Sequence, residues 1–166
     1  STEKEVIFDL WNGEQFGTAD YGRLMVELTG AADGLNPVRV TALSGTTGVT
    51  RASVAATTFT TASIADNQWH HYAVTLLSSS TGIETAFYVD GDLNNSNTTG
   101  SAGINEVGGA LRAYLGAAIT TPPGTAAPAK SGKLSGSLDE FRYWKIQRTS
   151  KDVGRYWFDQ VGGGTN

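Results

Sequence analysis

The stretch DNQWHHYAVT, residues 66–75, decides the fold of this chain when it is taken together with two later stretches. These are FYVDG, residues 87–91, and GSLDEFRYW, residues 136–144. In each stretch, aromatic and branched residues lie next to Gly or Asp, a combination typical of strands that enter or leave turns. The Asp90-Gly91 pair predicts a tight hairpin, because glycine adopts positive φ without a steric penalty. We therefore expect antiparallel strands joined by short turns.

The rest of the chain also shows patterns typical of strands. Alternation with a period of two occurs at residues 6–11, 23–28 and 38–42, as expected where one face of a strand covers a core. Residues 69–77 are apolar on both faces, which predicts a central strand covered on both sides. The other predicted strands are 47–55, 57–63, 83–90, 111–115 and a long final strand, 134–146. Polar loops are predicted at 92–107 and 119–132.

One helix is predicted, at residues 150–160. Thr149 precedes it as an N-cap, and Asp152 occupies the position of the acidic partner in a capping box. The helix has an apolar face formed by Val153, Tyr156 and Trp157. We expect this face to pack against the strands.

Many strands, frequent turns and one short C-terminal helix indicate an all-β fold, an antiparallel jelly-roll β-sandwich. We expect one sandwich domain, residues 1–161, followed by a Gly-rich tail, residues 162–166. The net charge is −4 and the 12 Lys and Arg residues are scattered, so no nucleic-acid partner is expected. The absence of cysteine excludes disulfides and thiolate metal sites. No apolar run approaches the ~18 residues of a membrane span, so membrane insertion is not expected.

Five motifs, in this order, resemble the laminin-G-like branch of the concanavalin A-like lectin/glucanase superfamily. They are Trp-His-His at 69–71, Tyr-Val-Asp-Gly at 88–91, Leu-Gly at 115–116, the stretch 136–142, and the helix that follows Thr149. The resemblance implies a concanavalin A-like sandwich that binds glycans or proteins and catalyses no reaction. The C-terminal part is also similar to modules in large structural proteins of phages.

The resemblance extends over most of residues 4–160 but departs from the family at the front. Family members begin with further strands that pair with the closing strand, whereas this sequence opens almost at once on the strand at residues 5–11. Three explanations stay open: a piece of a longer chain, strands supplied by another subunit, or a shorter branch of the family. Unpaired strand edges promote association, so we expect self-association or contact with other subunits.

Catalysis is not expected. The resemblance implies that a glucanase of this superfamily would carry the pattern Glu-x-Asp-x-Glu on one strand. This pattern places two carboxylates on the same face of the strand, about 5 Å apart in retaining enzymes. This sequence has no such triplet, and the adjacent Asp139 and Glu140 would point to opposite faces of a strand. The same geometry opposes a single metal ion bound by both His70 and His71. We expect these histidines to be hydrogen-bonded residues at the edge of the core.

Calcium is a possible cofactor, because relatives hold this ion at the rim of the sandwich. Asp90 and Asp139 are the candidate metal ligands, since calcium prefers carboxylate and carbonyl oxygens. An alternative interpretation stays open: Asp139 or Glu140 pairs with Arg142 or caps a loop amide.

For ligand binding, the candidate residues are Trp11, Asn94 and Asn95, because sugars are bound by exposed aromatic rings and planar amides. The other tryptophans, Trp69, Trp144 and Trp157, are expected in the core or under the helix. We expect a recognition or adhesion module of a larger extracellular or virion-surface protein. The alternative is a structural subunit of a viral or filamentous assembly, such as a capsid, decoration or tail protein.

Overall fold

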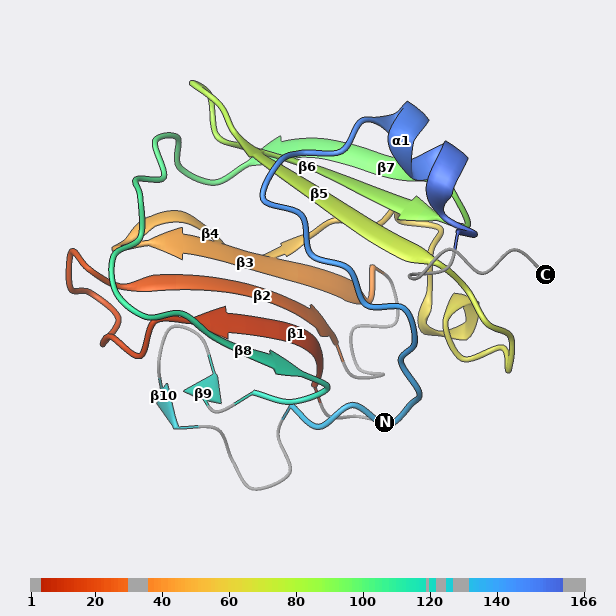
Figure 1. The fold of residues 1–166 in the computed structure, drawn as a ribbon, viewed down its shortest axis with the longest axis horizontal. Coiled ribbons are helices and arrows are strands. Elements are labelled where there is room, and N and C mark those ends of the chain that lie inside the picture. The colour runs from red at the N-terminus through yellow and green to blue at the C-terminus, as the bar shows by residue number, and fades with distance from the viewer. Residues whose placement is uncertain (1–3, 30–35, 119, 122–124, 127–131, 160–166) are drawn as a thin grey trace.

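Two antiparallel sheets lie one above the other in the computed structural model, which describes residues 4–29, 36–118, 120–121, 125–126 and 132–159 (Figure 1). Within these residues, the larger sheet has five strands in the order β4-β3-β2-β1-β8. Its strands are β1 (Glu5–Trp11), β2 (Gly22–Leu28), β3 (Val38–Ser44), β4 (Thr47–Ser53) and β8 (Arg112–Leu115). The smaller sheet contains β5 (Tyr72–Ser78), β6 (Ile83–Val89) and β7 (Asp92–Thr99), with β6 in the middle. Two further strands, β9 (Thr120–Thr121) and β10 (Thr125–Ala126), pair with each other as a separate antiparallel sheet.

The apolar core lies between the two sheets. Its buried residues come from β3, from the residues after β4 and from β6: Val38, Val40, Val54, Ala55, Phe59 and Phe87. Alternate residues of β2 and β5 pack against it: Leu24, Val26, Leu28, Tyr72, Val74 and Leu76. Burial of a side chain as large as Phe87 stabilises the fold by about 2–3 kcal/mol. The predicted β-sandwich is therefore confirmed.

The outer face of the larger sheet is buried as well, which period-two alternation does not predict. Asp9, Met25 and Thr41 are direct cross-strand neighbours on this face, and all three are fully buried. Arg23 reaches Asp9 with two hydrogen bonds, from Nε to Oδ1 at 2.9 Å and from Nη2 to Oδ2 at 2.8 Å. A charged pair thus takes the place of solvent-exposed polar residues on this side of the sheet.

The final strand predicted at residues 134–146 is wrong. In the described part of the closing segment, defined here as residues 132–149, only Gly132 makes a bridge, to Glu5. Glu140 has φ 50, a left-handed conformation that interrupts an extended strand. The segment instead packs against β1 through side chains: the ring centroids of Phe141 and Tyr143 lie 5.0 and 5.7 Å from that of Phe8. Aromatic packing rather than strand pairing holds this part of the chain.

Three other predicted elements also differ. The strand at 69–77 is the edge strand β5 rather than a central strand, because β6 pairs on both sides. Residues 57–63 contain the short 3₁₀ helix η2 (Thr61–Ser63) instead of a strand. The polar loop at 92–107 begins with β7, since the turn at Asp90-Gly91 returns the chain directly along β6. The polar side chains of β7 suit an edge strand that faces solvent.

The predicted helix is confirmed as α1 (Ser150–Tyr156), which lies close to β7 (Figure 1). Both hydrogen bonds of the capping box between Thr149 and Asp152 are present. Val153 is buried, whereas Tyr156 is 45% exposed. Gln160 and the predicted tail, residues 162–166, lie outside the described residues.

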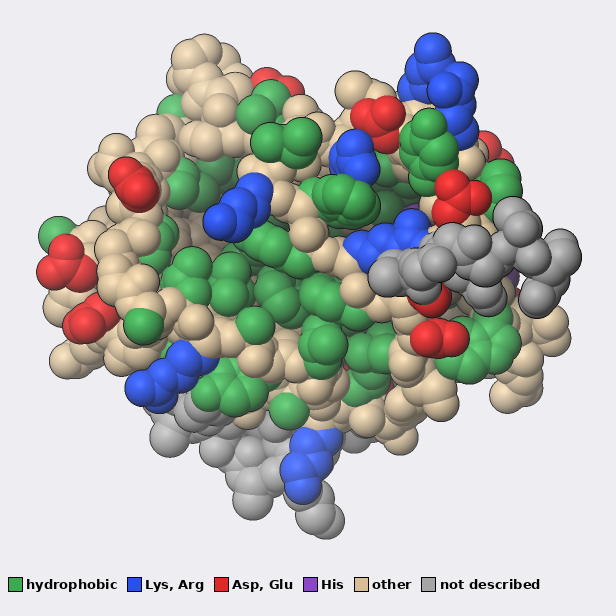
Figure 2. Space-filling model, viewed as in Figure 1, with side chains coloured by type: hydrophobic (Ala, Val, Ile, Leu, Met, Phe, Trp, Pro, Cys, Tyr) green, Lys and Arg blue, Asp and Glu red, His purple; other side chains and the backbone are tan. Residues whose placement is uncertain are grey.

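Hydrophobic side chains form a broad band across the middle of the face shown in Figure 2. The closing segment, α1 and the two residues after it contribute many of the exposed large hydrophobic residues: Leu138, Phe141, Tyr143, Trp144, Ile146, Tyr156, Trp157 and Phe158. Within the described residues, no helix has the length and apolar character needed to cross a membrane.

Candidate functional site

An exposed tryptophan marks the loop between η2 and β5, defined here as the Trp69 loop, residues 64–71. The Trp69 side chain is 72% exposed, although the sequence predicted it in the core. Asp66, Asn67 and Gln68, directly before it, are also exposed. Asn67 adopts φ 63, a left-handed conformation that asparagine tolerates better than most residues. The loop therefore presents one indole ring beside two planar amides.

Asp66 closes this loop on itself. Its Oδ1 accepts a hydrogen bond of 2.9 Å from the backbone N–H of Gln68, and its Oδ2 lies 2.9 Å from Nε2 of His70. Trp69 thus lies between two residues whose side chains are joined to each other. The loop has a defined backbone although its side chains face solvent.

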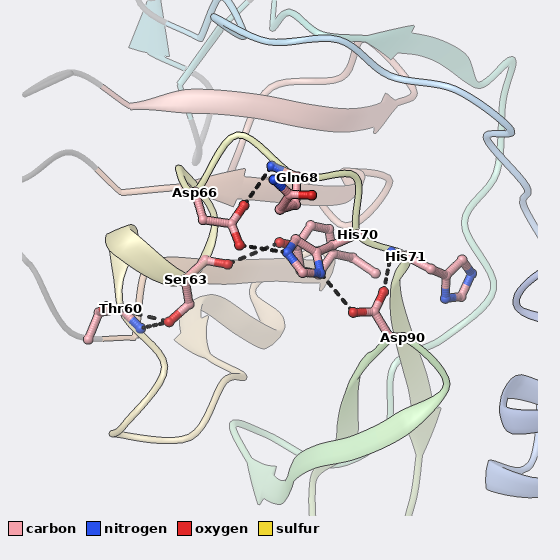
Figure 3. A network of polar contacts seen from close by, with 8 residues as sticks. Thr60, Ser63, Asp66, Gln68, His70, His71 and Asp90 are labelled. Atoms are coloured by element: carbon pink, nitrogen blue, oxygen red, sulfur yellow. Dashed lines mark hydrogen bonds and ion pairs between the residues drawn. The ribbon is translucent and has the colours of Figure 1, made fainter.

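Asp90 joins the same histidine to the β6–β7 turn. Its Oδ2 lies 2.7 Å from Nδ1 of His70, and its Oδ1 accepts a 2.8 Å hydrogen bond from the backbone N–H of His71 (Figure 3). The Asp90 N–H in turn donates to the carbonyl of His71 at 2.8 Å. We call the set Asp66, His70 and Asp90 the His70 bridge, because it connects the Trp69 loop to the smaller sheet.

The His70 bridge favours the charged form of the imidazole. Each ring nitrogen faces a carboxylate oxygen, and only the imidazolium has an N–H on both nitrogens. The bonds to Asp66 and then to Asp90 raise the pKa of His70, against a smaller opposing effect of burial. The bond to His70 is also the main reason that the pKa of Asp66 is lowered. The prediction that His70 is a hydrogen-bonded histidine at the core edge is confirmed.

His71 has a different environment, as expected for the next residue of an extended chain. Its ring points away from Asp90 and lies 6.2 Å from the ring of Trp157 (Figure 3). Its Nδ1 is buried and meets no hydrogen-bond partner among the residues that the structure describes. Burial, followed by the nearby charge of Arg142, lowers the pKa of His71. The neutral ring therefore acts as an apolar neighbour of Trp157.

Trp11, the first predicted ligand residue, is half-buried at the end of β1. Its Nε1 donates to the carbonyl of Glu14 at 3.1 Å, and the Arg23 guanidinium lies 5.3 Å from the ring centroid. The indole N–H of Trp11 and part of its ring therefore already contact other groups of the protein. A ligand-binding role for Trp11 stays a prediction.

Asn94 and Asn95, the other predicted ligand residues, join β7 to the residues after β4. Oδ1 of Asn94 accepts from the backbone N–H of Ala56 at 2.8 Å, and Nδ2 of Asn95 donates to the carbonyl of Val54 at 3.0 Å. These amides stabilise the junction between the two sheets. Their proposed contact with a ligand also stays a prediction.

Asp139 and Glu140 follow the alternative interpretation made from the sequence. Oδ1 of Asp139 accepts from the backbone N–H of Glu140 at 2.8 Å, and Glu140 pairs with Arg142 at 3.3 Å. Both oxygens of Asp90 accept from the two histidines, and no group of three metal-binding side chains occurs in the described residues. The structure thus identifies neither Asp90 nor Asp139 as a metal ligand, and the calcium hypothesis stays a prediction.

Comparison with known families agrees with this fold. A family model of laminin G type, described as the concanavalin A-like lectin/glucanases superfamily, matches residues 5–154. This chain belongs to that superfamily. The laminin-G-like resemblance seen in the sequence is therefore confirmed, whereas the similarity to phage modules stays a prediction. A search of curated proteins found no match.

Among solved structures, this laminin-G-like chain is similar to an S-layer domain-containing protein from Clostridium thermocellum, residues 221–444. The two share 16% identity with a TM-score of 0.39. The alignment covers 95% of this chain and 64% of the other.

Trp69 is not predicted as a site residue, because the apolar residues 69–77 together indicate one buried strand. A signal was nevertheless present. Three polar residues with turn propensity, Asp66, Asn67 and Gln68, precede Trp69, and β5 begins only at Tyr72. The tryptophan therefore belongs to the loop and not to the strand.

Proposed function

We propose that this domain is a non-catalytic recognition module that binds carbohydrate through the Trp69 loop. The exposure of the Trp69 indole is the observation that supports this proposal most directly. A flat ring that faces solvent stacks on the apolar face of a sugar, because the ring loses less hydration than a polar group would.

The neighbours of Trp69 fit the same ligand class. Asn67 and Gln68 are exposed and offer planar amides that both donate and accept hydrogen bonds, as sugar hydroxyls require. Because the Trp69 loop is tied to the β6–β7 turn, little conformational entropy would be lost on binding. We place the module outside the cell or on a virion surface, where glycans are accessible.

Absence of catalysis is part of the proposal. Hydrolysis of a glycosidic bond needs a protonated acid and a separate ionised carboxylate on either side of that bond. Asp66 and Asp90 instead both face the one imidazole of His70, and the hydrogen bond to His70 is the main reason that the pKa of Asp66 is lowered, so Asp66 is not suited to be the protonated acid. Release of reducing ends from any bound oligosaccharide would contradict this part of the proposal.

The test is binding to a glycan array, followed by calorimetric titration of the best oligosaccharide. Trp69→Ala is expected to lose about fivefold or more in affinity, since stacked aromatic contacts contribute roughly 1–3 kcal/mol. Trp69→Phe should retain part of it. The matched control is Trp144→Ala: Trp144 is 52% exposed, but Arg148 lies 3.8 Å from its ring centroid and covers one face. Equal loss in both variants would reject the Trp69 loop as the site.

An assembly role is the second candidate, favoured by the exposed apolar residues of the closing segment. The alternation of its side chains suits a strand, yet within the described residues the stretch 136–148 belongs to no sheet. We propose that another chain, of the same or a different protein, covers this surface. Light scattering after size exclusion tests self-association. A monomer at all concentrations, with calcium and with chelator, would contradict assembly of identical copies.

A further inference from the structure

The His70 bridge has a mechanical consequence for Trp69. Asp66 and His70 flank the three residues that carry the exposed amides and indole, and the two side chains are joined at 2.9 Å. His70 is also joined to Asp90, which lies at the turn between β6 and β7. One imidazole therefore holds the loop closed and holds it to the sheet at the same time.

We propose that His70 is a positioning residue for ligand binding: it fixes the Trp69 loop by donating to Asp66 and Asp90 together, and affinity falls when it loses its proton. This inference rests on the proposed function, because it concerns the same loop. His70 itself need not touch the ligand.

The physical reason lies in the donors that an imidazole can offer. A neutral ring has one N–H, so loss of the proton leaves one carboxylate opposite a lone pair, and that contact becomes repulsive. Asp66 and Asp90 keep their backbone donors, Gln68 N–H and His71 N–H. The β6–β7 turn therefore stays formed, and His70 keeps only one of its two contacts, either to Asp66 in the loop or to Asp90 in the turn, so it no longer joins the loop to the turn.

The ionisable groups around His70 agree with loss of its proton above the ordinary imidazole pKa of about 6.5. Asp66 faces it from the loop, Asp90 from the β6–β7 turn, and the Tyr72 ring of β5 lies 6.0 Å away. Both carboxylates favour the imidazolium. Burial raises the pKa of Tyr72 to about 12, so this phenol stays neutral while His70 titrates.

The binding test uses the best oligosaccharide from the array, titrated calorimetrically from about pH 5.5 to about pH 9. The wild type is expected to lose about three- to tenfold in affinity across this range, the effect of two solvent-exposed ion pairs. His70→Gln should bind weakly at every pH. His70→Arg should stay strong at high pH, because it keeps the positive charge. His71→Gln is the control and should keep the pH dependence of the wild type.

A second measurement needs no ligand, so it separates this inference from the proposed function. The indole N–H of Trp69, assigned by comparison with Trp69→Phe, is followed by NMR during a pH titration. Its shift should follow the titration of His70, and Asp66→Asn should weaken that dependence. If the Trp69 signal ignores His70 titration, the positioning role is wrong, whatever the protein binds. If it follows His70 and no glycan binds, the proposed function is wrong and the bridge is only structural.

Discussion

Phe8 of β1 packs against Phe141 of the closing segment, with ring centroids 5.0 Å apart and planes inclined by 34°. The two residues come from opposite ends of the chain, and no strand pairing joins them in the described residues. The ring of Phe8 is buried, whereas that of Phe141 is partly exposed. The contact therefore attaches the middle of the closing segment to the sandwich, in addition to the hydrogen bonds that Gly132 and Leu134 make at its start.

Phe8→Ala should lower the free energy of unfolding by about 3–5 kcal/mol, since it leaves a cavity under the closing segment. Phe141→Ala should cost about 1–2 kcal/mol, because its ring is only partly removed from water. Urea denaturation measures both. Phe158→Ala, which removes a largely exposed ring, serves as the control and should change stability by about 0.5 kcal/mol or less. Equal costs for Phe8 and Phe158 would show that the contact between Phe8 and Phe141 does not stabilise the fold.

The buried pair between Asp9 and Arg23 should be costly to break and inexpensive to replace. Both side chains have zero exposure, and they share two hydrogen bonds. Arg23→Ala should lower the free energy of unfolding by about 3–5 kcal/mol, because it leaves a carboxylate buried without its cation. The double variant Asp9→Leu with Arg23→Met should recover most of that loss. A double variant less stable than Arg23→Ala would contradict this account.

Gly91 should tolerate alanine less well than Gly109, although φ is +87 at Gly91 and +85 at Gly109. A Cβ at Gly91 would approach the ring of Trp157, whereas nothing lies within 4 Å at Gly109. Alanine at either position costs about 1 kcal/mol in backbone strain. Gly91→Ala should cost about 1–3 kcal/mol more, from displacement of the indole. Thermal unfolding and tryptophan fluorescence measure the difference, and similar values at both positions would exclude the packing explanation.

The stability contributed by His70 should disappear as the pH rises. The pKa of His70 is raised in the folded protein, so its contribution is complete below the ordinary value of about 6.5 and is lost as the pH passes the raised pKa. The pKa of Asp66 is lowered, so its contribution is present above about 3.9 and is lost in more acidic solution. The melting temperatures of wild type and His70→Gln should therefore differ most between these limits and converge in alkaline solution. A constant difference would show that His70 acts by packing alone.

The sequence predicted the sandwich and α1 because those patterns are local. The alternation in β2, the turn at Asp90-Gly91 and the capping box at Thr149 each depend on residues close together in the chain. In the folded protein, β1 lies between β2 and β8 and pairs with both. A strand can therefore be predicted from the sequence wherever one of its faces packs against the core.

The closing segment and Trp69 could not be predicted in the same way. Residues 134–146 can form a strand only if a sheet edge lies close enough to pair with them. The alternation of their side chains does not show whether such an edge exists. Whether Trp69 is buried depends on where β5 begins, three residues later. The candidate ligand residues Asn94 and Asn95 present the same difficulty, since a polar side chain on an edge strand can serve either a ligand or its own backbone.

The β6–β7 turn supports two separate parts of the protein on adjacent residues. Asp90 holds the Trp69 loop through His70, and the indole of Trp157, just after α1, lies directly over Gly91. The Trp157 ring leaves no room for a side chain at Gly91, so the packing of the residue after α1 and the position of Asp90 depend on the same tight turn. A change in the backbone of this turn would therefore disturb two distant parts of the surface at once, the Trp69 loop and the C-terminal end of α1.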